Sequence, residues 1–336
     1  MGILAREAGL NFFALASWHL FMQSKWQTWL VRWMGAFSIY REGMDRHAMN
    51  TAIDILADAQ RPLIVFPEGA ISRTNDRLTP MMDDVAFMAR SAAKKRAKAQ
   101  SDTKVVIHPV ALRYYFTGNI HQTLAPVLDE IETRLSWQVQ RHLPLIERIT
   151  KVGKSLLCLK EIETFGDEQS GSIEIRLDRL IDHLLVPVET RWLSKPHKSY
   201  VKERVKRLRS AILPDMVKGD ISDADHDSRW RQLAGIYLAQ QLSNYPPDYI
   251  RSRPTIERLL ETVERFEEDL TDAARPHHGL KVVVQVGDAI DVPLQRDRHS
   301  NSDPLMSTIE QQLQAMLGKL TDERVTMYEE VAKWSS

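Results

Sequence analysis

Residues 61–73, RPLIVFPEGAISR, constrain the fold of this chain more than any other stretch. The run of β-favouring residues 63–66 stops at Pro67, which cannot donate to a β-ladder. This apolar run predicts a short strand buried on both faces of a mostly parallel sheet. Gly69 then allows a tight turn or a close approach of the backbone to a ligand. Polar residues follow where open α/β sheets usually place their chemistry, and these are Glu68, Ser72 and Arg73.

The preceding segment completes a strand–helix–strand unit. Residues 35–41 have a strand pattern, and Asp45 can cap a helix over residues 46–59, whose apolar positions recur at helical spacing. Arg41 therefore ends one strand, and it converges with the residues after the next strand if the two strands are neighbours. On these residues alone, a surface ion pair with Glu42 or Asp45 explains Arg41 better than anion binding does.

Four segments, taken together, resemble the glycerolipid acyltransferases, the lysophosphatidic-acid acyltransferase family. FPEG followed by Ser-Arg, at residues 66–73, resembles the third motif of that family. Residues 35–41 resemble the second motif, residues 105–111 the fourth, and residues 281–292 the strand with which such domains often close. One FPEG would be weak evidence, whereas four matches in the right order are much stronger.

The resemblance implies a fold and an activity. The fold would be α/β, with a mostly parallel central sheet flanked by helices, a large helical insertion before the last strand and a C-terminal helix. The activity would be that of a 1-acylglycerol-3-phosphate O-acyltransferase-like enzyme of phospholipid biosynthesis. It would transfer a fatty acyl group from a coenzyme A or acyl-carrier-protein thioester to a hydroxyl of a lysophospholipid or glycerol-phosphate-like acceptor. No cofactor and no metal are implied.

The resemblance also assigns roles to residues. The acceptor would be bound by residues from the second and third motifs, namely Arg41, Glu68, Gly69, Ser72 and Arg73. Pro109, in the fourth motif, would shape the acyl-donor side. An arginine suits a phosphate because its planar guanidinium donates two parallel charge-assisted hydrogen bonds.

The catalytic motif of the family is missing from the sequence. That motif, His followed five positions later by Asp, supplies the base, because an acceptor hydroxyl is a poor nucleophile until its proton is removed. His19 is followed at that spacing by Ser24, and His47 by Ala52. We therefore expect the catalytic His and Asp to lie upstream of Met1. The alternative is a non-catalytic, membrane-associated lipid-binding or scaffold protein that keeps the fold without the base.

Composition narrows the class of protein. Lys plus Arg equals Asp plus Glu at 45 each, so no global field favours nucleic acid. A single cysteine, Cys158, excludes an internal disulfide framework and a cysteine-rich zinc site, which suits a reducing cytoplasm. No stretch reaches the roughly 18 consecutive apolar residues of a membrane span. We expect a cytoplasmic protein associated peripherally with the inner face of the membrane.

An aromatic stripe near the N-terminus allows two interpretations. Its residues recur at steps of four, four, three and four, and they are Trp18, Met22, Trp26, Trp29 and Trp33. This spacing puts them on one helical face, which either packs into the core or lies at the headgroup level of a membrane, flanked by Lys25 and Arg32. The sequence leaves both interpretations open.

The strand pattern lapses after residue 115 and returns near residue 280. We predict an acyltransferase-like core over residues 1–120, a helical insertion over 121–279, the final strand of the core over 280–295 and a C-terminal helix over 300–336. We detect no internal repeat in the sequence and expect none in the fold.

Overall fold

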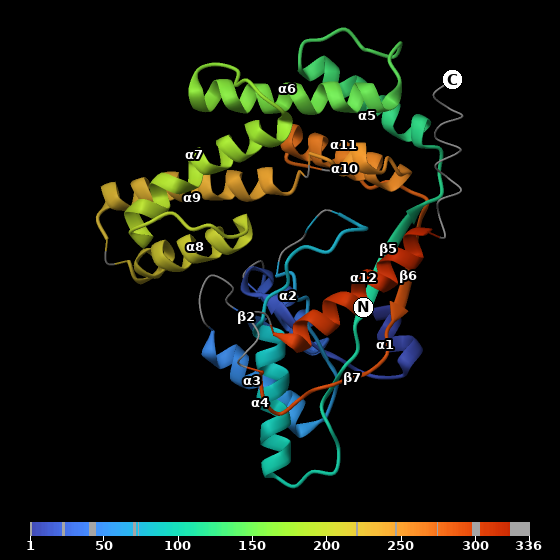
Figure 1. Ribbon diagram of the computed structural model, residues 1–336, viewed down its shortest axis with the longest axis vertical. Helices are drawn as coiled ribbons and strands as arrows, with labels where there is room; N and C mark the ends of the chain where they lie inside the picture. The colour runs from blue at the N-terminus through green and yellow to red at the C-terminus, as the bar shows by residue number, and fades with distance from the viewer. Residues whose placement is uncertain are drawn as a thin grey trace. The chain divides into compact units, whose positions relative to one another are not determined.

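The computed structural model describes residues 2–21, 24–39, 45–69, 72, 74–219, 221–245, 247–273, 275–297 and 303–322 (Figure 1). The chain forms two compact units. Unit 1 comprises Met1–Ile71, Leu78–Ala111 and Gln285–Met316, and unit 2 comprises Ser72–Arg77, Leu112–Val284 and Leu317–Ser336. The short segment after the FPEG turn therefore belongs to unit 2, although the turn itself belongs to unit 1.

Unit 1 contains a three-stranded parallel sheet in the order β2-β1-β3. Its strands are β1 (Phe13–Ser17), β2 (Ala36–Ile39) and β3 (Leu63–Ile64). Ala14 of the middle strand lies opposite Ala36 on one side and Ile64 on the other. Helices α1 (Gly2–Ala8), α2 (Lys25–Trp33), α3 (Arg46–Asp58) and α4 (Asp84–Lys98) flank the sheet, with a 3-10 turn, η1 (Trp18–Phe21), after β1. The predicted α/β class with a parallel sheet is confirmed.

Two details of the predicted sheet are wrong. The strand before Pro67 has only two ladder residues, and they are half-buried at one end of the three-stranded sheet rather than buried on both faces. The middle strand is β1, which sequence patterning missed because FALAS is short and runs into the aromatic stripe. Because β1 separates β2 from β3, these two strands do not pair, and the condition for Arg41 to converge with the residues after β3 is not met.

Small residues bring α3 and α4 together. Asp45 caps α3 as predicted, since its carboxylate accepts a hydrogen bond from the backbone N–H of Ala48 at 2.9 Å. Ala48 and Ala52 are buried on α3, and α4 buries a row of alanines, Ala86, Ala89, Ala92 and Ala93. Such small side chains allow close packing of the two helices, which fixes the connection between β2 and β3.

The remaining strands form two pairs. β4 (Val106–Ile107) pairs antiparallel with β7 (Ile290–Asp291), and β5 (Val110–Phe116) pairs with β6 (Leu280–Val286). Pro109 lies between β4 and β5, as predicted for a strand broken by proline. Among the described residues, neither pair joins the three-stranded sheet.

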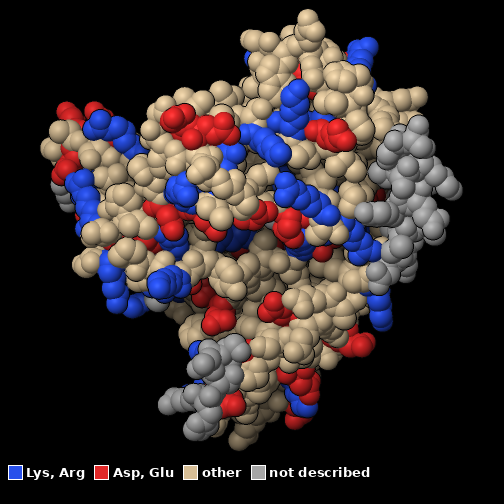
Figure 2. Space-filling view, turned by 45° about the horizontal axis from the view of Figure 1, so that its top comes forward, with Lys and Arg blue, Asp and Glu red and all other residues tan. Residues whose placement is uncertain are grey.

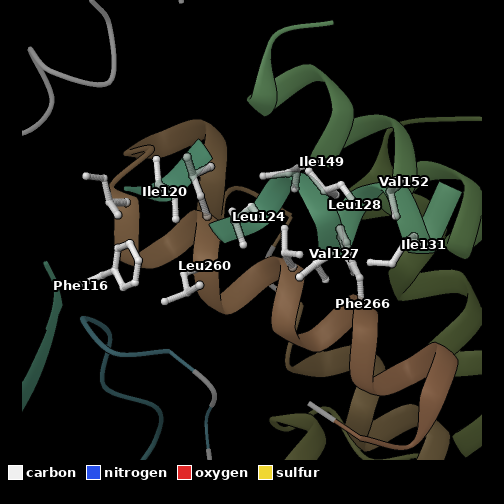
Figure 3. Packing of buried hydrophobic residues seen from close by; sticks show 13 residues of the cluster. Phe116, Ile120, Leu124, Val127, Leu128, Ile131, Ile149, Val152, Leu260 and Phe266 are labelled. Atoms are coloured by element: carbon white, nitrogen blue, oxygen red, sulfur yellow. The ribbon is translucent and has the colours of Figure 1, made fainter. Parts of the chain in front are cut away.

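Unit 2 is built mainly from helices α5 (Ile120–Arg134), α6 (Leu145–Phe165), α7 (Ile173–Leu193), α8 (Val201–Lys218), α9 (Asp223–Ser243), α10 (Tyr249–Ser252) and α11 (Ile256–Thr271). This confirms the helical insertion, and α12 (Pro304–Asp322) confirms a C-terminal helix. One hydrophobic cluster joins α5, α6 and α11 around Leu124, Leu128 and Phe266 (Figure 3). A second cluster joins α6, α7, α8 and α9. The apolar side of α8, including Leu208, is part of that second core.

The helices of unit 2 repeat, contrary to the expectation from sequence. One buried position recurs at a constant spacing of 28 residues on five successive helices, and it is occupied by Leu124, Val152, Leu180, Leu208 and Ile236. All five are fully buried. Any medium-sized aliphatic side chain can fill these positions. The repeat is therefore hard to detect from residue identity.

A Glu–Arg clamp recurs with nearly the same period, since its arginines are 28 residues apart and its glutamates 29 and 28. A glutamate near the end of one helix accepts two hydrogen bonds from the Nε and Nη2 atoms of an arginine near the start of the next, at 2.6–3.0 Å. The pairs are Glu132 with Arg148, Glu161 with Arg176 and Glu189 with Arg204. Each glutamate also accepts a backbone N–H eight residues later, from Gln140, Gln169 and His197. The Glu–Arg clamps therefore set the α5–α6, α6–α7 and α7–α8 turns.

Candidate functional site

The FPEG segment forms a tight turn directly after β3. The backbone N–H of Gly69 donates to the carbonyl of Phe66 at 3.2 Å, and Gly69 has a φ of 64°. Met82 closes the turn from the other side, since its N–H donates to the carbonyl of Pro67 at 2.8 Å. A left-handed residue is required at this point of the chain, and glycine adopts that conformation without steric cost.

The carboxylate of Glu68 holds the loop that follows. Its Oε2 atom accepts a hydrogen bond from the backbone N–H of Thr79 at 3.0 Å and another from the Thr79 hydroxyl. Hydrogen bonds to a carboxylate are about twice as strong as neutral ones. Glu68 therefore fixes Thr79 beside the FPEG turn, and its predicted contact with an acceptor remains a prediction.

The other predicted acceptor residues are placed differently. Arg41 and Arg73 lie outside the described residues. Ser72 belongs to unit 2, where its hydroxyl lies 3.4 Å from the carbonyl of Thr74 in a local turn. Glu68 and Gly69 are adjacent in the FPEG turn of unit 1.

Pro109 is anchored by Gly287, the glycine of the closing segment at residues 281–292. The carbonyl of Pro109 accepts a hydrogen bond from the N–H of Gly287 at 2.8 Å, and the Nδ1 atom of His108 lies 3.1 Å from the Gly287 carbonyl. A Cβ atom at Gly287 would lie 2.9 Å from the sulfur of Met316. Gly287 therefore packs closely within unit 1, and the predicted role of Pro109 on the acyl-donor side remains a prediction.

The segment after the turn carries contacts that sequence reasoning missed. The side chain of Asn75 donates to the carbonyl of Tyr114 at 2.6 Å and accepts from its N–H at 2.8 Å, so the amide completes a backbone-like pair with β5. Arg77 makes a bidentate ion pair with Asp248, at 2.9 and 2.8 Å. The polar residues 74–77, directly after the FPEG turn, are the feature of the sequence that could have indicated these contacts.

Asp76 is buried within the same segment. Its carboxylate accepts a hydrogen bond from the Nε of Arg258 on α11 at 2.8 Å, and the Nη1 of Arg113 lies 3.7 Å away. A buried carboxylate needs such cations, because desolvation of a lone charge would cost several kcal/mol. The segment after the FPEG turn is thus held by β5 and the helices of unit 2.

Within the described part of the chain, no cluster of three or more potential metal ligands occurs. No helix there is long and apolar enough to cross a membrane. Acidic and basic side chains alternate over the face in Figure 2, which agrees with the balanced composition.

Replacing Gly69 by Ala is expected to destabilise unit 1 by about 1–2 kcal/mol, because L-residues are strained at this φ. The added Cβ would also lie 2.7 Å from the terminal methyl of Met82, which must move. Gly9 provides a matched control, since its φ is 62° and a Cβ atom there would have no atom within 4 Å apart from those of its chain neighbours. Urea unfolding of Gly69→Ala and Gly9→Ala measures the loss of stability in each, and the difference between them gives the cost of moving Met82. A Gly69→Ala variant as stable as the wild type would contradict the left-handed conformation of Gly69.

Comparison with known proteins gives a match, which covers the N-terminal third of the chain. The protein-family model described as Acyltransferase matches residues 1–113. That segment contains the three-stranded parallel sheet, the FPEG turn and the Pro109 kink. Comparison with curated proteins and with solved structures gave no match. Residues 1–113 are therefore similar to the acyltransferase family.

Proposed function

We propose that this chain carries the acceptor-binding part of an enzyme that transfers a fatty acyl group from an acyl thioester to a hydroxyl of a lysophospholipid or glycerol-phosphate-like acceptor. The FPEG turn directly after a parallel strand, inside the segment that matches the acyltransferase family, carries the proposal. The thioester of coenzyme A or an acyl carrier protein would be the donor, with no further cofactor. The reaction would take place at the inner face of the membrane.

The acceptor side would use the predicted residues in two ways. Arg41 and Arg73 would bind a phosphate through paired charge-assisted hydrogen bonds. Glu68 and Gly69 would shape the turn that precedes Arg73, because Glu68 fixes Thr79 and Gly69 supplies the left-handed residue. On this account Glu68 acts through the loop that it holds.

The base is proposed to come from a His-x4-Asp motif upstream of Met1. No histidine in the sequence is followed five positions later by Asp. His19 lies in η1 directly after β1, but the side chain of Ser24, at the motif spacing, accepts the N–H of Gln27 at 3.1 Å as the N-cap of α2. Ser24 is therefore used as a helix cap and offers no carboxylate. In the full site, the histidine would remove the acceptor proton as the hydroxyl attacks the thioester carbonyl.

The test extends the reading frame upstream and compares the longer protein with the present chain. Transfer of a long-chain acyl group from its thioester to lysophospholipid is expected only in the longer form, since a positioned base contributes roughly 10²–10⁴-fold. In that form, Glu68→Gln should lower kcat/KM about 10- to 100-fold, because hydrogen bonds to a charged group are worth about 1.5–3 kcal/mol.

Glu7→Gln is the control for the Glu68 variant. Glu7 is exposed and pairs only with the neighbouring, exposed Arg6 among the interactions the structure gives it, so this change should leave transfer unchanged. Transfer by the 336-residue chain that is insensitive to Glu68→Gln would refute the proposal. Inactivity of both lengths, with lipid binding intact, would favour the non-catalytic lipid-binding or scaffold protein.

A further inference from the structure

Helix α2 turns its apolar stripe outward. Trp26, Trp29, Leu30 and Trp33 occupy positions i, i+3, i+4 and i+7, which form one face of the helix. Trp26 is 70% exposed and Trp33 is 73% exposed, and no residue of α2 is buried. This excludes core packing for the part of the aromatic stripe that lies on α2. We call this surface, with Met34 after it, the tryptophan face.

Residues beside and behind the tryptophan face tie α2 to η1. The hydroxyl of Thr28 donates to the carbonyl of Phe21 at 2.7 Å, and the guanidinium of Arg32 lies 5.9 Å from the centre of the Phe21 ring. Ser24 caps the first turn. These contacts hold the helix in the orientation that exposes the tryptophan face.

The tryptophans are already stacked on one another. The ring centres of Trp26 and Trp29 are 5.1 Å apart with an interplanar angle of 22°, and those of Trp29 and Trp33 are 6.4 Å apart at 13°. Their apolar area is therefore presented as one continuous surface rather than as three separate side chains. Burying it would release the water that it orders, with a gain of roughly 25 cal/mol per Å².

The charges of α2 identify the occupant of this surface. The sequence KWQTWLVRW contains two cations, Lys25 and Arg32, both exposed, and no acid. A second copy of the same face would bring like charges together, whereas an anionic headgroup layer complements them. Tryptophan favours the depth of the headgroups, and a helix of nine residues, about 14 Å long, is suited to lying in that plane.

We propose that α2 docks flat on an anionic phospholipid bilayer, with the tryptophan face at headgroup depth and Lys25 and Arg32 on lipid phosphates. The inference rests on the proposed function, because such docking would bring the acceptor-binding part of the enzyme to the membrane that contains its acceptor. It deepens that function by naming the surface that contacts the lipid.

The experiment measures binding of the full chain to vesicles without any acyl donor, so its result does not depend on catalysis. Binding should be stronger to phosphatidylcholine vesicles that contain about one third phosphatidylglycerol than to pure phosphatidylcholine, and salt should weaken it. Trp26→Ser/Trp29→Ser/Trp33→Ser should lower the partition coefficient at least about tenfold. Lys25→Glu/Arg32→Glu should remove the preference for phosphatidylglycerol.

Two single variants control for the loss of an exposed apolar side chain elsewhere. Phe87 on α4 is 57% exposed and Trp230 on α9 is 54% exposed, so Phe87→Ser and Trp230→Ser should bind vesicles as the wild type does. Circular dichroism checks that each variant folds. Undiminished binding by the triple variant, or absence of wild-type binding, would overturn the proposal. So would light scattering that shows a dimer lost only in the triple variant, because that result would assign the tryptophan face to a second copy.

Discussion

Glu189→Gln is expected to lower the free energy of unfolding of the helical unit by about 3–5 kcal/mol, the usual cost of removing one partner from a buried ion pair. Glu189 is fully buried and binds Arg204 through two hydrogen bonds, at 2.8 and 3.0 Å. Among the described residues, the neutral amide would leave the buried Arg204 with Asp182 as its only carboxylate partner, and the Asp182 side chain is 60% exposed. Urea unfolding followed by circular dichroism measures the difference.

A neighbouring pair supplies the control for this clamp. Glu203 pairs with Arg207 on the surface of α8, where both side chains are about half exposed, so Glu203→Gln should change stability by no more than about 0.5 kcal/mol. Replacing both Glu189 and Arg204 by methionine should restore much of the loss, because no unpaired charge remains buried. A Glu189→Gln variant within about 1 kcal/mol of the wild type would contradict the role of the Glu189–Arg204 pair. Effects on the unfolded state usually account for only a few tenths of a kcal/mol.

Local signals in the sequence were sufficient to predict part of unit 1. Asp45 identified the start of α3 because an N-cap acts within three residues. Pro67 and Pro109 identified the strand ends because a missing N–H cannot enter a ladder. Gly69 was predicted at a tight turn, and it has a positive φ. Each of these residues acts on backbone within about three residues of itself, so the sequence alone reveals the effect.

Features that depend on distant partners could not be predicted in this way. The middle strand β1 is defined by its two neighbours, which lie some 20 and 50 residues along the chain. Periodicity placed Trp26, Trp29 and Trp33 on one face, but only the contacts of Thr28 and Arg32 with η1 decide that this face is exposed. The contacts of the candidate site could not be predicted either, because the donors to the Glu68 carboxylate belong to Thr79, eleven residues away.

Protonation of Glu261 on α11 is expected to make unit 2 more stable at pH 5 than at pH 8, by about 2–3 kcal/mol. Its carboxylate accepts a hydrogen bond from the Tyr249 hydroxyl and one from the N–H of Asn75 at 3.4 Å, while Asp76 adds a nearby negative charge. Burial raises the pKa of Glu261 to about 7, although Arg265 opposes the shift. The folded state therefore binds the proton more tightly than the unfolded chain.

The sign of the effect follows from that raised pKa. The stabilisation is complete below the ordinary pKa of a glutamate, near 4.5, and it is lost as the pH rises through about 7. Glu261→Gln keeps an acceptor for Tyr249 without a charge, so this variant should match the wild type at pH 5 and exceed its stability at pH 8. Glu163→Gln, at an exposed pair with Lys160, should follow the wild type at both values. Urea unfolding across this range decides, since equal pH dependence in the wild type and Glu261→Gln would show that Glu261 is ionised in the folded protein throughout.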